Sequence, residues 1–86
     1  KDVQVYPNPS NGANAITVEF KLNKTANVSV GVVNILGKTV SSVNAGKMDQ
    51  GTQTQSINIA NYADGIYFAK IAVDGITQTV KFTVTR

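Results

Sequence analysis

The sequence predicts an all-β fold in which about seven antiparallel strands form two packed sheets. Apolar and polar residues alternate with period two along most of the 86-residue chain, as in segment 16–22, which is typical of strands with one buried face. Residues that favour turns separate these segments at intervals of roughly 8–12 residues, a spacing typical of a β-sandwich. No window of about 11 residues has a helical period, so we expect no helix.

Each expected strand follows from its own pattern. The expected strands are residues 3–6, 16–22, 26–32, 39–44, 52–59, 65–73 and 76–85. In segment 39–44, Val40 and Val43 are out of phase, which predicts a β-bulge. The first half of segment 52–59 alternates among polar residues only, so we expect an exposed sheet edge there.

Turn residues support the same division. Asp74 and Gly75 lie between two strong strand patterns and predict a two-residue type I′ turn, which needs a positive φ at both positions. Segment 34–37 predicts a tight connection with a left-handed glycine. Pro7 and Pro9 lack the amide hydrogen that a central strand donates, so we expect a stiff, extended segment at an edge or in a loop.

The composition excludes several classes of function. The chain has no Cys and no His, which rules out disulfides, thiolate or imidazole catalysis and Cys/His zinc sites. The net charge is +3, but the basic residues are scattered singly, which does not favour nucleic-acid binding. The carboxylates are dispersed as well, and Asp64 and Asp74 each precede a turn glycine. We therefore expect no enzyme activity and no cofactor.

Segment 65–73 is the most apolar part of the chain and allows two interpretations. Alternation places Tyr67 on one face and Ile66, Phe68 and Lys70 on the other. The first interpretation is a central strand that is buried on both faces near its start. The second is a docking patch for a partner.

The last segment, 76–85, also allows two interpretations. Its outward positions hold Thr residues and Lys81, which is typical of an ordinary edge strand protected against unwanted pairing. Alternatively, its free edge is read by a receptor that adds a strand to the sheet.

Several short motifs occur in a specific order and spacing. They are Tyr6-Pro7-Asn8-Pro9 with Gly12, Asn34-Ile35-Leu36-Gly37-Lys38, Asp64-Gly65-Ile66-Tyr67-Phe68-Ala69-Lys70-Ile71 and Val80-Lys81-Phe82-Thr83-Val84-Thr85-Arg86. Over essentially the whole chain, this order resembles the type A C-terminal sorting domains of proteins exported by the type IX secretion system of Bacteroidetes.

The resemblance implies a fold and a function. It implies a single C-terminal sorting domain over residues 1–86, with a seven-stranded immunoglobulin-like sandwich that follows a larger cargo. The implied partners are the outer-membrane translocon, its shuttle component and a sortase protease that typically removes the domain. The cargo would pass through the periplasm to the cell surface or the medium, and would be joined to lipopolysaccharide or released.

The resemblance also assigns motif residues in this chain. Pro7, Pro9 and Gly12 match the opening motif, and Gly37 matches the hairpin glycine. The remaining matches belong to the aromatic strand motif and the terminal motif, which comprise Gly65, Tyr67, Phe68, Lys81, Phe82, Val84 and Arg86. The resemblance further implies a cleavage site near or before Lys1.

Two other functions remain open from the sequence. The first is an extracellular immunoglobulin- or fibronectin-like module that binds carbohydrate or protein, which predicts an exposed platform built from Tyr6, Tyr62 and Tyr67. The second is a spacer or dimerisation domain, because exposed strand edges allow homodimers to form.

Overall fold

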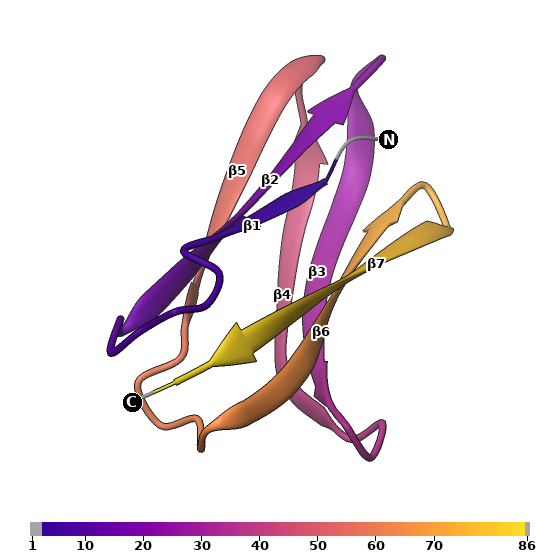
Figure 1. Cartoon of the computed structure of the whole chain (residues 1–86). Helices are drawn as coiled ribbons and strands as arrows, with labels where there is room; N and C mark the ends of the chain where they lie inside the picture. Colours follow the sequence, from indigo (N-terminus) through magenta and orange to yellow (C-terminus); the bar gives the residue numbers. More distant parts are fainter. Residues whose placement is uncertain (1–2, 86) are drawn as a thin grey trace.

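The computed structural model describes residues 3–85, and within this range the chain forms seven strands and no helix (Figure 1). In chain order the strands are β1 (Gln4–Tyr6), β2 (Ala15–Leu22), β3 (Ala26–Asn34), β4 (Thr39–Met48), β5 (Gly51–Asn58), β6 (Gly65–Val73) and β7 (Ile76–Val84). Every expected strand is present, which confirms the all-β prediction.

The strands form two antiparallel sheets that pack face to face, as an immunoglobulin-like sandwich does. The smaller sheet has the order β1-β2-β5, and the larger has the order β4-β3-β6-β7. The edge position expected for segment 52–59 is confirmed, since β5 borders the smaller sheet and its first half is partly or fully exposed.

The hydrophobic core lies between the sheets. The alternating residues Ile16, Val18, Phe20 and Leu22 of β2 are all 4% exposed or less. They pack with the inward side chains of the larger sheet, of which the most buried large ones are Phe82 and Ile71. This burial of apolar surface is the main force that holds the two sheets together.

A bulge in β4 reconciles the two valines that are out of phase in the sequence. The pairing of β3 with β4 moves from Val32 opposite Ser41 to Val33 opposite Thr39, which leaves Val40 as the extra residue. The prediction of a bulge is therefore confirmed. A second shift, at Ala45, bends the same strand again.

The two prolines near the N-terminus lie in a bend that follows β1, and all of residues 7–9 are exposed. Their exclusion from a central strand is confirmed. The expected extended conformation is wrong, because the chain turns here towards β7 to make the contacts described below.

The β6–β7 hairpin has the turn that the sequence predicts. Asp74 and Gly75 have φ values of 48° and 87°, and Val73 pairs with Ile76 across the turn. The Asp74 amide donates to the Asn27 carbonyl at 3.0 Å, and an Asp74 carboxylate oxygen accepts from the Asn27 amide at 3.1 Å. These two bonds fasten the turn to the start of β3.

The outer face of β6 differs from the first interpretation of segment 65–73. Although β6 lies between β3 and β7, Ile66 is 36% exposed and Phe68 is only partly buried. Burial on both faces is wrong, because no further layer in residues 3–85 covers this side of the larger sheet.

We predict that Gly75→Ala lowers the free energy of unfolding by about 1–2 kcal/mol, because an L residue is strained in this left-handed conformation. Gly31→Ala serves as the control, because Gly31 has no positive φ and a Cβ there would meet only the Ser41 carbonyl oxygen at 3.4 Å. Urea unfolding of both variants measures the difference. If both variants lost the same free energy of unfolding, the turn would not require a left-handed conformation at residue 75.

Candidate functional site

The loop that follows β1 lies along the C-terminal half of β7. The Ser10 amide donates to the Thr83 carbonyl at 3.1 Å, and the Gly12 amide donates to the Thr85 carbonyl at 2.7 Å. Residues more than 70 positions apart in the sequence are therefore joined by backbone hydrogen bonds. Gly12 adopts a φ of 74°, a left-handed conformation that favours glycine.

Two Asn side chains of this loop complete the contact. Asn8 accepts a hydrogen bond from the Thr83 amide at 3.1 Å and donates one to the Lys81 carbonyl at 3.5 Å. Thr85 donates its hydroxyl hydrogen to the Asn11 side chain at 2.5 Å. We call residues 8–12, together with the edge 81–85 that they cover, the edge clasp.

The edge clasp changes the interpretation of the terminal strand. Backbone groups of Lys81, Thr83 and Thr85 that would pair with an added strand are already bonded to residues 8–12. The expectation of a free edge is therefore wrong over residues 81–85. A strand from a partner could pair with residues 81–85 only after residues 8–12 have moved away from β7.

The structure separates the motif residues into buried and exposed groups. Tyr67, Phe82 and Val84 are 8% exposed or less and form part of the core. The Tyr67 ring lies 5.8 Å from that of Phe82 and 4.9 Å from that of Tyr62, and its hydroxyl donates to the Ala63 carbonyl at 2.7 Å. The side chains of these motif residues therefore pack inside the sandwich.

The other described motif residues lie at four places. Pro9 and Gly12 belong to the loop of the edge clasp, which Pro7 directly precedes, and Gly37 lies in the β3–β4 turn with a φ of 84°. Lys81 pairs with Phe68 on the outer face of the larger sheet. Gly65 has a φ of 154° at the start of β6. Arg86, which completes the terminal motif, lies outside the described residues.

The tyrosine platform of the alternative binding module is not formed. Tyr6 is exposed on the smaller sheet, where its hydroxyl donates to Glu19 at 3.0 Å, and this bond raises the pKa of Tyr6. Tyr62 is half-buried beside Ser41, to which it is hydrogen-bonded, and burial raises the pKa of Tyr62. With Tyr67 in the core, the three rings do not share a surface.

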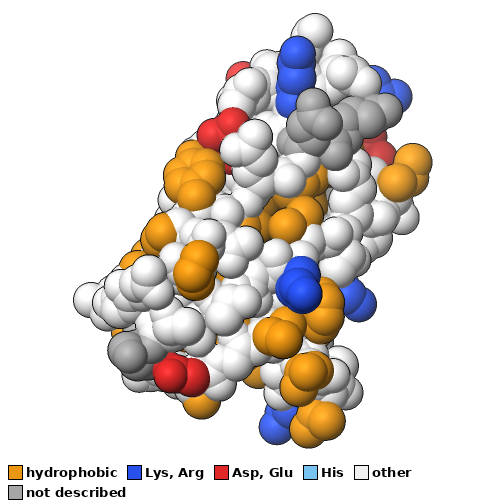
Figure 2. Space-filling model, viewed as in Figure 1, with side chains coloured by type: hydrophobic (Ala, Val, Ile, Leu, Met, Phe, Trp, Pro, Cys, Tyr) orange, Lys and Arg blue, Asp and Glu red, His pale blue; other side chains and the backbone are white. Residues whose placement is uncertain are grey.

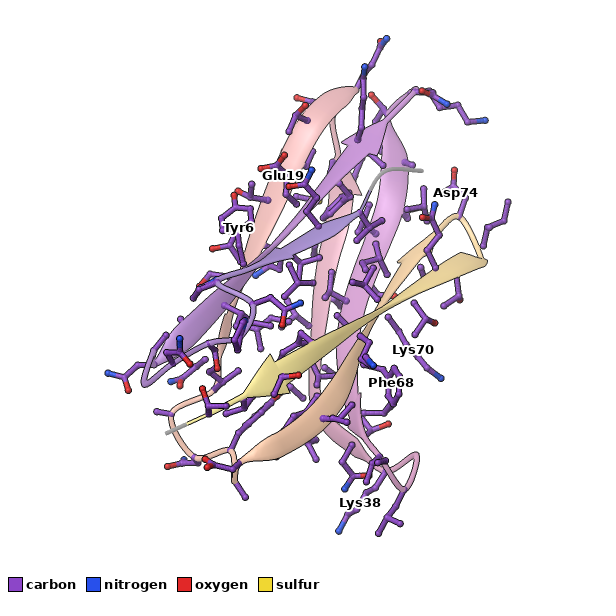
Figure 3. All side chains as sticks on the ribbon, in the orientation of Figure 1. Tyr6, Glu19, Lys38, Phe68, Lys70 and Asp74 are labelled. Atoms are coloured by element: carbon purple, nitrogen blue, oxygen red, sulfur yellow. The ribbon has the colours of Figure 1, made fainter. Side chains whose placement is uncertain are left out.

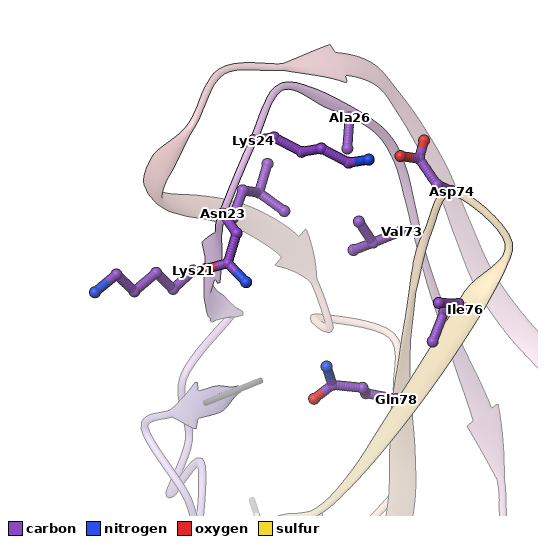
Figure 4. Close-up of a pocket in the computed structure, with 9 residues that line it drawn as sticks. Lys21, Asn23, Lys24, Ala26, Val73, Asp74, Ile76 and Gln78 are labelled. Carbon is purple, nitrogen blue, oxygen red and sulfur yellow. The ribbon is translucent and has the colours of Figure 1, made fainter.

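A cleft of about 390 Å³ opens at the end of the sandwich between the β2–β3 connection and the β6–β7 hairpin (Figure 4). Its apolar lining comes from Leu22, Ala26, Val73 and Ile76, and Lys21 and Lys24 lie at its rim. Asp74 is the carboxylate of this lining, and it is already bonded to Asn27. The described part of the chain has no group of three potential metal ligands, and no helix in it could span a membrane.

The sequence interpretation missed Asn8 and Asn11 as site residues. The sequence around Asn8 could have indicated a role for its side chain. Asn8 is flanked by two prolines, which lack amide hydrogens, so its side chain is the main hydrogen-bond donor and acceptor of this segment. The partner strand, however, lies 75 residues away, and no local pattern indicates it.

Comparison with known proteins assigns the chain to a family. The family model described as the secretion system C-terminal sorting domain matches residues 4–85. The chain belongs to this family. The resemblance to type IX sorting domains seen in the sequence is thus confirmed, and secretion to the cell surface or the extracellular space follows for the protein that carries such a domain.

Among solved structures, a protein of the secretion system shares the fold of this sorting domain. It is PorZ, described as an essential bacterial surface component of the type IX secretion system of Porphyromonas gingivalis, with a TM-score of 0.70 at 20% identity. The similarity covers 98% of this chain and 11% of PorZ, so the sorting domain spans about a tenth of that protein's length. No curated protein is significantly similar to the chain.

We predict that Asn8→Ala lowers the free energy of unfolding by about 1–3 kcal/mol, because it removes two hydrogen bonds and leaves the Thr83 amide without this acceptor. Ser10→Ala, in the same loop, is the matched control. Ser10 is buried, and within residues 3–85 its hydroxyl has no hydrogen-bond partner, so its loss costs no bond. Chemical denaturation measures both. A loss for Ser10→Ala as large as that for Asn8→Ala would contradict this account of the clasp.

Proposed function

We propose that this sorting domain is a folded label that carries an N-terminally attached cargo through the outer membrane by the type IX route and performs no reaction itself. The observation that supports it most is the family match over residues 4–85, which includes both partners of the edge clasp. The sequence also lacks the His and Cys residues on which most nucleophilic catalysis depends.

The clasp suggests why a label of this kind acts as a folded unit. Its loop and its terminal strand are far apart in the sequence and adjacent only after folding. A receptor that contacts both elements would therefore bind the folded domain and not an unfolded or truncated cargo. We propose that the outer-membrane translocon and its shuttle component read this arrangement after the cargo has crossed the periplasm.

We further propose that a sortase removes the domain upstream of β1 and that the cargo is then joined to lipopolysaccharide or released. Residues 4–6 pair with β2, and the amides of Ser10 and Gly12 are bonded to β7. Hydrogen-bonded backbone of this kind resists proteolysis, because a protease needs an unpaired, extended segment. Cleavage is therefore expected before the first strand.

We predict that Lys81→Ala lowers export of a fluorescent reporter fused in front of the domain by about tenfold and leaves the reporter in the periplasm. Lys81 is exposed, so its loss should not unfold the domain. Deletion of residues 83–86 should abolish export, since it removes the buried Val84 and opens the clasp. Cell fractionation of a bacterium with a type IX system is the measurement.

Lys21→Ala is the control for Lys81→Ala, because it removes the same charge from an exposed position of β2 in the smaller sheet. Normal surface levels of the Lys81→Ala and truncated forms would contradict the proposal. The binding-module alternative is tested separately, since glycan binding by the isolated domain would favour it. The possibility of a homodimer through strand edges stays a prediction, for which light scattering over a concentration series is the measurement.

A further inference from the structure

The outer face of the larger sheet has an unbalanced charge. The sequences of β3, β4, β6 and β7 contain Lys47, Lys70 and Lys81 but no Asp or Glu. The β3–β4 turn adds Lys38. Asp74, in the β6–β7 turn, borders this face at the end opposite to Lys38. The strands themselves carry only positive charge, so the rest of the face attracts negatively charged surfaces.

Apolar side chains gather at one end of the same face. Leu36 is 88% exposed and Ile35 is 67% exposed in the β3–β4 turn, and Ile66 is exposed on β6. Phe68 lies beyond Ile66 along β6, two residues further from the turn and opposite Val33 of β3. Orange and blue side chains adjoin in the lower part of Figure 2, and Figure 3 places Phe68 and Lys70 above Lys38 in this region.

We call this surface the hairpin-tip patch and define it as Ile35, Leu36, Lys38, Ile66, Phe68 and Lys81. These side chains are not part of the hydrophobic core. A run of large apolar residues that are exposed beside one another is uncommon on a monomer and marks a site of protein contact.

The tip is held rigidly by Asn34. An oxygen of its side chain accepts from the Leu36 amide at 2.9 Å and from the Lys38 amide at 3.0 Å. Its backbone accepts from the Gly37 amide and donates to the Lys38 carbonyl, each at 2.9 Å. A turn with four such bonds loses little conformational entropy on binding, so the exposed Leu36 is already arranged for docking.

A shallow depression adjoins the patch on the outer face. Its volume is about 300 Å³, and it forms because Gly31 lies between Val33 and Ser29 and has no side chain, while Lys70 lies on one side. The combination of an apolar tip, a neighbouring depression and surrounding lysines matches a protein surface that places apolar side chains among carboxylates.

We propose that the hairpin-tip patch is the surface by which the sorting domain docks on an acidic, apolar protein surface of the outer-membrane export machinery. This inference rests on the proposed function. A lipid surface fits less well, because Ile66 and Phe68 lie on the flat sheet face and not at the projecting tip. If only the tip inserted into a membrane, Ile66 and Phe68 would stay outside the lipid.

The test uses a purified type IX translocon with its shuttle component in detergent as the probe, and the immobilised sorting domain as the ligand. We expect Leu36→Ser and Lys38→Glu each to weaken binding by about tenfold or more, and the effect of Lys38→Glu to shrink at high salt. Lys21→Glu is the matched control, because it makes the same charge change on the opposite sheet. Thermal unfolding of all variants establishes that the fold is kept.

Reporter export by the same variants separates the two proposals. If the parent domain exports the reporter and the patch variants neither bind nor export while Lys21→Glu does both, the inference is supported. If the parent and both patch variants bind and export equally, the inference is wrong and the proposed function stands. If the parent does not export, both are wrong. Loss of binding to anionic vesicles with unchanged binding to the translocon would also overturn the inference.

Discussion

The register of the β6–β7 hairpin is the constraint on which the rest of the domain depends. The two positive φ angles at Asp74 and Gly75 make Val73 pair with Ile76, and every later pair follows from this one. Phe82 therefore points into the core and Lys81 points out. A shift by one residue would exchange them and bury an ammonium group without a partner, at a cost of several kcal/mol.

The same register prepares the edge that the N-terminal loop covers. Thr83 presents both its amide and its carbonyl away from β6, and the loop supplies the Asn8 side chain and the Ser10 amide to meet them. An uncovered edge of this length would be a template for pairing with other chains. The clasp thus keeps the terminal strand from aggregating and at the same time joins the two ends of the domain.

Local patterns in the sequence were sufficient to predict the strands, the β4 bulge and the hairpin turn, because alternation and turn residues act over a few neighbours. They were not sufficient for contacts between distant segments. The partner of Asn8 lies 75 residues away, and the outer face of β6 is exposed only because no other element within residues 3–85 crosses it. The docking interpretation of segment 65–73 already included Ile66 and Phe68, but Leu36 was missed, since a residue in a turn has no alternation to indicate which way it faces.

The burial of the motif residues has a consequence for how such a label can vary. Tyr67 and Phe82 stack against each other inside the sandwich. A substitution at either residue therefore first lowers the stability of the domain through lost packing. Lys38 and Lys81 make no contribution to the core and can change without unfolding the domain. Loss of export through Tyr67 or Phe82 would therefore accompany loss of stability, whereas loss through the lysines would not. Measuring stability and export together distinguishes residues that maintain the fold of the domain from residues that the export machinery recognises.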